Sequence, residues 1–178
     1  MRISGGAARG RTLDVPPAAR PTTDRVRQAI FNVLRSLRPI EGRGLDLYAG
    51  SGALGIEGLS RGLSACDFVE ERSIACRVIK ENLARAGFQR EGRVICAPAI
   101  NAGSQLEGPY SLVFADPPYA DDGALGAVNG LESLLDPGAV IVVEHSGRRQ
   151  PPERVAGRPA LRFKRYGDSA ITFYGRGG

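Results

Sequence analysis

The stretch "LDLYAGSGALG", residues 45–55, decides the fold of this chain. Its apolar first half is typical of a buried strand, and Gly50, Gly52 and Gly55 follow with G-x-G-x-x-G spacing. Glycines let the backbone turn tightly and approach a ligand without a Cβ clash, and the helix that opens after Gly52 offers free N–H groups to an anion. The stretch therefore predicts a strand–turn–helix unit for a nucleotide-like cofactor, but its spacing suits more than one such cofactor.

Segments with strand and helix character alternate along the rest of the chain. Strands are predicted at 44–49, 65–70, 93–97, 110–116 and 139–145, and helices at 22–37, 53–62, 73–87 and 121–135. In the helix at 73–87, the residues predicted to face inward are Ile74, Val78, Ile79 and Leu83. The tail 160–175 is predicted to form two antiparallel strands around a "YGDS" turn. This order predicts an α/β fold with a doubly wound, mostly parallel sheet and a C-terminal antiparallel hairpin, the Rossmann-like class I methyltransferase fold.

The length predicts a single domain over residues 1–178. Residues 1–21 are rich in Gly, Pro and Arg, and "RIS" and "RTLDV" predict a short N-terminal β-hairpin ahead of a catalytic core at 22–178. The chain contains no apolar run of about 18 residues and its N-terminus lacks the apolar region of a secretory signal. We therefore expect a cytoplasmic protein without a transmembrane helix.

Cysteine and histidine usage excludes several kinds of site. Cys66, Cys76 and Cys96 are widely spaced and form no C-x-x-C pair, so we expect free thiols and neither a disulfide framework nor a zinc site. His145 is the only histidine, which excludes a His-based triad or a multi-His metal site. We expect no bound metal.

The distribution of positive charge indicates an anionic partner. The formal net charge is +5, and arginines crowd the start of the chain, at Arg2, Arg9, Arg11, Arg20, Arg25 and Arg27. A solvated basic face would explain such a cluster, but a phosphate-binding surface is the interpretation that we favour.

Two acidic residues distinguish between the possible cofactors. Glu70 ends the strand after the glycine loop, where a carboxylate can accept hydrogen bonds from both hydroxyls of a ribose. Asp46 lies inside the strand before the loop, where a buried charge is costly unless it has a role. The ammonium of S-adenosylmethionine needs an anion at this place, whereas the pyrophosphate of NAD would be repelled by one. A buried Asp that serves only backbone N–H groups is the structural alternative.

The string "VFADPPYA" points to the acceptor of the reaction. Asp116, Pro117, Pro118 and Tyr119 follow a predicted strand directly. The prolines stiffen the turn and leave carbonyls free, and an adjacent aromatic ring can stack on a flat base. The Asp116 carboxylate and the Pro117 carbonyl can accept both hydrogens of an exocyclic amine, which aims the nitrogen lone pair at a methyl donor. Asp116 can also take the released proton as a general base.

These segments together resemble the bacterial guanine-N2 methyltransferases of 16S ribosomal RNA, the RsmD type. The resemblance covers nearly the whole chain and includes "RPTTDRVRQAIFNVL", "LDLYAGSGALGIEGLSRG", "VFADPPY" and the closing "KRYGDSAITFY". It implies S-adenosylmethionine as cofactor and 16S RNA or an assembling small subunit as partner, and we expect a monomer. The cofactor positions it implies are Asp46, Gly50, Ser51, Gly52 and Glu70, and the base positions are Asp116, Pro117, Pro118 and Tyr119. The string around Arg20, Thr22 and Arg25 would line the cofactor or RNA side, and we extend the RNA-binding expectation to Arg9 and Arg11.

Two positions depart from the family pattern. Pro98 stands where relatives have an acidic residue for the adenine amine, so adenine recognition is expected to use backbone atoms near Ala99. Arg72 stands where an Asp is common. Two other functions remain open at this point: adenine-N6 methylation of RNA or DNA, because both bases present an amine, and a non-catalytic RNA- or nucleotide-binding module that has lost its cofactor. An NAD-dependent oxidoreductase is a more distant alternative.

Overall fold

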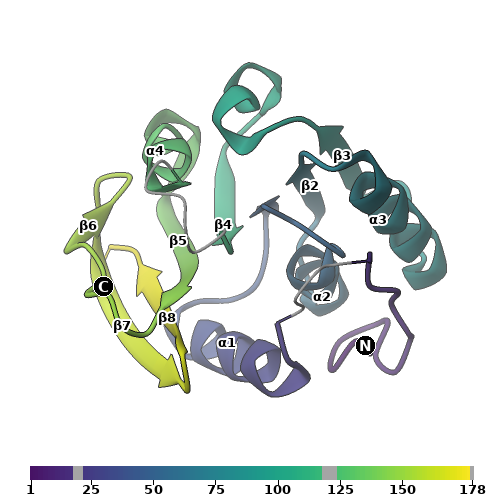
Figure 1. Cartoon of the computed structure of the whole chain (residues 1–178), viewed down its shortest axis with the longest axis horizontal. Coiled ribbons are helices and arrows are strands. Elements are labelled where there is room, and N and C mark those ends of the chain that lie inside the picture. The colour runs from purple at the N-terminus through teal and green to yellow at the C-terminus, as the bar shows by residue number, and fades with distance from the viewer. Residues whose placement is uncertain (18–21, 118–123, 177–178) are drawn as a thin grey trace.

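The computed structural model describes residues 1–17, 22–117 and 124–176, and within them eight strands form one sheet (Figure 1). The strand order is β3-β2-β1-β4-β5-β8-β7-β6. Pairing is parallel from β3 to β5 and antiparallel from β5 to β6. The strands are β1 (Arg43–Leu47), β2 (Ala65–Glu70), β3 (Gly92–Cys96), β4 (Tyr110–Ala115), β5 (Leu135–Ser146), β6 (Arg154–Val155), β7 (Arg158–Tyr166) and β8 (Ser169–Tyr174). The predicted fold class is confirmed.

Helices cover both faces of the sheet, as a doubly wound fold requires. One face packs against α1 (Asp24–Leu37), α2 (Ala53–Arg61) and α3 (Ser73–Ala86). The other packs against α4 (Ala124–Asn129) and the short 3₁₀ turns η1 (Ala99–Asn101), η2 (Gly103–Gln105) and η3 (Glu132–Leu134). Thr23 caps α1 by accepting the Val26 N–H. None of the helices in the described parts of the chain is long and apolar enough to cross a bilayer.

The parallel order determines where a ligand can bind. Strand β1 pairs with β2 on one side and β4 on the other, so the loops after these three strands meet at one edge of the sheet. Parallel α/β sheets bind ligands at this edge, outside the carboxyl ends of the strands. Gly50, Glu70 and Asp116 all lie there, although they are far apart in the sequence. We call it the carboxyl edge.

The N-terminal segment forms less regular structure than predicted. "RIS" and "RTLDV" do pair in antiparallel fashion, through a bridge between Arg2 and Thr12 and backbone hydrogen bonds that join Met1 to Leu13 and Ile3 to Arg11, but the pairing is too short to form regular strands. The same segment also binds α2: the Ser4 N–H and hydroxyl donate to Glu57, and the Ala8 N–H donates to Ser60 Oγ. Buried Glu57 also pairs with buried Arg27 at 3.3 Å. A paired buried charge of this kind fixes the segment against α1 and α2, beside which Figure 1 places it.

Two other helix predictions need correction. The prediction that Ile74 faces inward is wrong: it is 57% exposed, because Ala75, Cys76 and Ile79 form the buried face of α3 and Ile74 lies outside that face. The segment predicted as one helix at 121–135 contains the short α4 and then η3 within its described part. Gly130 follows α4 directly, and glycine is a poor helix former.

Candidate active site

Each of the three glycines of the loop is needed for a particular physical reason. Gly50 and Gly52 adopt φ values of 57° and 76°, which L-residues with a side chain rarely adopt. Gly55 lies inside α2, where an added Cβ would come within 2.4 Å of the Phe68 ring. The helix therefore packs directly on β2, as in dinucleotide-binding turns. Tyr48, just before the loop, also has a positive φ of 61°, a strained conformation that sequence patterns do not reveal.

Asp46 is a buried carboxyl beneath this loop. The residue is 2% exposed, and its Oδ2 accepts the Gly55 N–H at 2.8 Å. Burial raises the pKa of Asp46 to about 8, and the nearby carboxyls of Asp116 and Glu70 add to the shift. A group in this state gains strongly from a neighbouring cation, because a cation restores the charged form. The hydrogen bond to Gly55 fits the structural alternative, in which the carboxyl serves a backbone N–H group.

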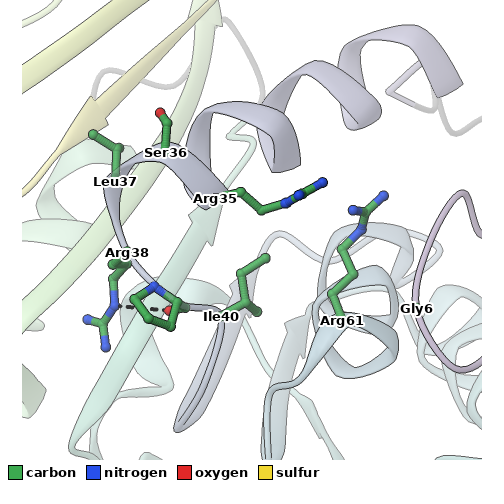
Figure 2. Close-up of a pocket in the computed structure, with 8 residues that line it drawn as sticks. Gly6, Arg35, Ser36, Leu37, Arg38, Ile40 and Arg61 are labelled. Carbon is green, nitrogen blue, oxygen red and sulfur yellow. Dashed lines mark hydrogen bonds between the residues drawn. The ribbon is translucent and has the colours of Figure 1, made fainter.

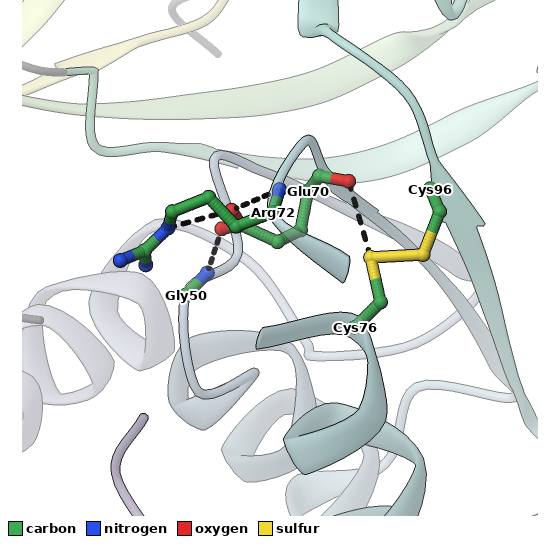
Figure 3. Close-up of a disulfide and its surroundings, with 5 residues drawn as sticks. All are labelled: Gly50, Glu70, Arg72, Cys76 and Cys96. Atoms are coloured by element: carbon green, nitrogen blue, oxygen red, sulfur yellow. Dashed lines mark hydrogen bonds and ion pairs between the residues drawn. A yellow bond between two sulfur atoms is a disulfide. The ribbon is translucent and has the colours of Figure 1, made fainter. Parts of the chain in front are cut away.

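Glu70 connects the end of β2 to the loop after β1. Its Oε2 accepts the Gly50 N–H at 2.9 Å, while Oε1 accepts the Arg72 backbone N–H at 3.0 Å and its side-chain Nε at 3.2 Å (Figure 3). Each carboxylate oxygen has two acceptor sites, so these three contacts leave one site, on Oε2, for a ribose hydroxyl. Arg72, which departs from the family pattern, therefore forms an ion pair with Glu70, the residue predicted to bind the ribose.

Asp116 lies on the same edge, one strand away from the glycine loop. It follows β4 directly, and burial together with the charge of Glu144 raises its pKa to about 7. A hydrogen bond from Thr22 opposes this shift, and the Thr22 hydroxyl also lies 3.2 Å from Glu144 Oε2. Pro117 is partly buried beside it. Pro118 and Tyr119 lie outside the described residues, so their predicted roles stay predictions.

Asn82 is a site residue that sequence patterns do not indicate. It is fully buried in α3, and its Nδ2 donates to the Ser51 carbonyl at 2.9 Å and to the Asp14 carbonyl at 2.9 Å. Its Oδ1 accepts the Asp14 N–H at 2.8 Å. One amide thus joins the glycine loop to the N-terminal segment. A polar residue on an amphipathic helix usually faces solvent, so the sequence does not indicate that Asn82 is buried and joins these two segments.

The adenine end of the expected cofactor site lies after β3. Pro98 precedes η1 with an extended ψ of 139°, and Ala99, half-buried, is the first residue of that turn. The first N–H groups of a helical turn have no partner inside it. Backbone recognition near Ala99 is therefore compatible with the structure, and it remains a prediction.

A disulfide borders this region, contrary to the expectation of three free thiols. Cys76 in α3 is joined to Cys96 at the end of β3, with their Cα atoms 6.1 Å apart (Figure 3). The two cysteines are distant in sequence, but β2 and β3 are neighbouring strands and α3 starts just after β2. Cys66 is free and buried, and burial raises the pKa of its thiol. Within the described residues, no group of three or more His, Cys, Asp or Glu side chains could hold a metal.

The structure separates the predicted RNA-binding arginines. Arg25 lies in the first turn of α1, near Thr22 and close enough to Tyr166 for its charge to affect the pKa of that phenol. Arg11 instead donates to the Arg85 carbonyl at 2.9 Å, in the last turn of α3. Arg9 sits in a turn that packs on the last turn of α2. Arg9 and Arg11 therefore lie toward the amino ends of the parallel strands, opposite to the carboxyl edge. Arg20 falls outside the described residues.

A cavity of about 570 Å³ also lies away from the carboxyl edge. It forms where α1 and α2 end, and Figure 2 shows the Arg35 and Arg61 side chains reaching toward one another across it. Arg61 is held there by Glu57 at 2.8 Å and by Ser4 Oγ at 2.9 Å. Helix C-termini attract such cations. The cavity contacts none of the residues predicted to bind cofactor or base.

Comparisons with known proteins agree with this geometry. The family model described as "Conserved hypothetical protein 95" matches residues 1–175. The "Ribosomal RNA small subunit methyltransferase D" of Escherichia coli K12 is 38% identical over 92% of this chain and 88% of its own, and that of Haemophilus influenzae is 35% identical over 81% and 78%. The solved structure titled "Putative methyltransferase yhhF from Escherichia coli" is 36% identical with a TM-score of 0.84, covering 99% of this chain and 97% of that one. With the glycine loop, Glu70 and Asp116 at one edge of such a sheet, this chain belongs to the RsmD family, whose model is described as Conserved hypothetical protein 95.

Proposed function

We propose that this chain methylates the exocyclic N2 amine of a guanine in 16S ribosomal RNA, using S-adenosylmethionine. The observation that carries the proposal is the position of Asp116 and Pro117 at the end of β4, next to the loop after β1. Relatives named as small-subunit ribosomal RNA methyltransferases support the choice of substrate. The RNA would be bound free or within an assembling small subunit, by a monomer in the cytoplasm.

The residues around the loop fit this cofactor. When bound, S-adenosylmethionine supplies an electrophilic methyl group on a positively charged sulfur. Asp46, whose raised pKa reports a buried carboxyl without a counterion, would hold the methionine ammonium. Glu70 would accept a ribose hydroxyl, and the backbone of Gly50, Ser51 and Gly52 would line the methionine end. Because Asp116 and Glu70 help to raise the pKa of Asp46, and Glu144 helps to raise the pKa of Asp116, a cationic ligand is favoured at this edge and a pyrophosphate is not.

The residues after β4 would prepare the base. The Asp116 carboxylate and the Pro117 carbonyl would accept the two amine hydrogens, which fixes the nitrogen lone pair in the direction of attack. Asp116 would then take the proton that the amine loses. With a pKa of about 7, this carboxyl is close to the value that suits a general base at neutral pH. We further propose that Tyr119 stacks on the base and that Pro118 stiffens the turn.

Methyl transfer to RNA tests the proposal directly. The protein is incubated with methyl-labelled cofactor and either 16S RNA or small subunits from a strain lacking the activity, and modified nucleosides are identified by mass spectrometry. We expect N2-methylguanosine. N6-methyladenosine would identify the adenine enzyme, and absence of label in both substrates would refute the proposal. Asp116→Ala should abolish transfer and leave binding of S-adenosylhomocysteine intact, which separates catalysis from cofactor binding.

A further inference from the structure

The strand β7 presents an exposed aromatic side chain among positive charges. Phe163 is 48% exposed, one of the few large apolar side chains that the described residues leave in solvent. Arg162, Lys164 and Arg165 flank it, and all four are exposed. Neighbouring side chains of a strand point to opposite faces, so cations are available on both sides of β7. Only Pro159 and Arg158 of β7 pair with β6, which leaves the outer edge of β7 open beyond them within the described chain.

The sheet register places Phe163 in line with the catalytic strand. Ala115 pairs with Val143, Val143 with Thr172, and Thr172 with Phe163, so all four lie in one row across β4, β5, β8 and β7. Ala115 immediately precedes Asp116. Three strand spacings separate the ends of this row, about 14 Å. That distance suits a neighbouring nucleotide of a bound RNA strand, rather than the reacting base itself.

The next rows place the flanking charges toward the carboxyl edge. Glu144 pairs with Ile171 and Ile171 with Lys164, while His145 pairs with Ala170 and Ala170 with Arg165. The ring centroids of His145 and Phe163 lie 6.1 Å apart, so the His145 ring packs beside the exposed Phe163 ring and supports it. Asp168, in the turn after β7, pairs with Arg148 at 3.8 Å, so its negative charge is balanced by that arginine. We call the surface formed by Arg162, Phe163, Lys164 and Arg165 the β7 surface. Its three exposed cations make it strongly positive.

We infer that the β7 surface binds a single-stranded segment of the substrate RNA that passes around the open edge of β7, with one base stacked on Phe163, phosphates beside Arg165 on the same face, and phosphates beside Arg162 and Lys164 on the other face. Aromatic side chains within a basic surface are the usual platform for single-stranded nucleic acid, because every base has a face that can stack. Arg9 and Arg11 lie toward the other edge, so β7 and Arg25 supply positive charge beside Asp116 instead. The inference rests on the proposed function, since it assumes an RNA substrate.

Binding of a fluorescein-labelled, single-stranded RNA of mixed sequence tests the inference by anisotropy at several salt concentrations. Phe163→Ala should weaken the affinity by about 5- to 100-fold, the range for loss of a stacked base. It should leave the slope of log K against log salt unchanged. Replacing Arg162, Lys164 and Arg165 together with Gln should lower that slope by about 2, since each phosphate contact contributes roughly 0.7 for single strands. Both variants should raise the KM for RNA and leave cofactor affinity unchanged.

Matched controls distinguish the β7 surface from general effects. Val15→Ala removes another exposed apolar side chain, and Arg77→Gln with Arg90→Gln removes exposed cations of α3 and the loop after it. These controls should retain the RNA affinity and most of the salt slope. Wild-type affinity in Phe163→Ala, or a triple variant that aggregates but binds RNA normally, would overturn the inference and show that the cations only protect an open strand edge. Failure of the proposed function is different: the wild-type protein would then methylate no RNA.

Discussion

The buried amide of Asn82 donates to the carbonyl of Ser51 at 2.9 Å, and this contact fixes the position of the glycine loop. The same amide makes two hydrogen bonds with the backbone of Asp14. Loop geometry and the position of the N-terminal segment are therefore coupled through one side chain, although neither Asn82 nor Asp14 is expected to touch the cofactor.

Asn82→Asp should weaken cofactor binding. A carboxylate would face the Ser51 and Asp14 carbonyls with no hydrogen to donate, and unsatisfied buried groups cost about 1–3 kcal/mol of unfolding free energy. We expect the Kd for S-adenosylhomocysteine to rise by about tenfold or more, a loss of at least about 1.4 kcal/mol. Calorimetric titration and urea unfolding measure the two effects. Asp14→Ala is the control: it removes only the exposed ion pair with Arg85 and should change neither quantity.

Glu70→Gln should weaken cofactor binding more than Arg72→Ala does. Glutamine has one acceptor oxygen with two acceptor sites, so it cannot serve the Gly50 N–H, the Arg72 N–H and a ribose hydroxyl together. We expect at least a tenfold higher Kd for S-adenosylhomocysteine, because charge-assisted hydrogen bonds are lost. Arg72→Ala removes a half-exposed ion pair, whose net contribution is about 0–1 kcal/mol, so its Kd should stay within about fivefold. Equal losses in both variants would contradict the assignment of Glu70.

Methyl transfer should depend on pH through Asp116. This carboxyl must be ionised to accept the amine hydrogens, and its pKa is raised to about 7. The rate at subsaturating RNA should fall about tenfold for each pH unit below 7 and level off above it.

Thr22→Val provides the matched variant for this profile. The Thr22 hydrogen bond lowers the pKa of Asp116, so its loss should move the whole profile to higher pH. A profile that is flat between pH 6 and 8 would contradict a role for Asp116 as the base.

Asp46→Asn should stabilise the cofactor-free protein at high pH. The folded pKa is raised from 3.8 to about 8, so the native state holds a proton that the unfolded state has released. This contribution favours folding at low pH and is lost as the pH rises toward 8. Asn keeps an acceptor for the Gly55 N–H and carries no charge. The stability advantage of the variant should therefore grow between pH 5 and 8 by up to about 1.4 kcal/mol per unit, as urea unfolding at several pH values would show. Its cofactor affinity should fall.

Thiol labelling should distinguish the three cysteines. Without reductant, an alkylating reagent should leave the native protein unmodified, because Cys76 and Cys96 are joined and Cys66 is buried with a raised pKa. After reduction, Cys96 should react first, since its residue is exposed whereas Cys76 is buried. Intact-mass measurement before and after reduction would show this, and labelling of two thiols without reductant would contradict the disulfide.

The sequence was sufficient for features that depend on local backbone rules. Gly50 and Gly52 need positive φ values, and Glu70 ends the next parallel strand, so spacing alone predicts that they meet. The strand–helix order and the C-terminal hairpin follow from periodicity in the same way.

Features that depend on side-chain contacts between distant segments could not be predicted. Thr22 near the start of the chain reaches Glu144 near its end, and Asn82 of α3 reaches Asp14 of the N-terminal segment. The disulfide depends on how far α3 and β3 extend, and the short N-terminal hairpin is held against α2 by Glu57 and Ser60. None of these contacts leaves a periodic pattern in the sequence.

The central position of β1 has a consequence for how the molecule assembles. Leu45 of β1 pairs with Asp67 of β2, the next strand along the chain, whereas Gly44 pairs with Leu112 of β4, which follows only after β2, α3 and β3. Closing a longer chain segment costs more entropy, and contacts between distant residues slow folding. We therefore expect β1, α2 and β2 to form an early nucleus that already shapes the glycine loop, with β4 docking afterwards. A newly made chain would thus form its glycine loop before Asp116, the proposed base, reaches it.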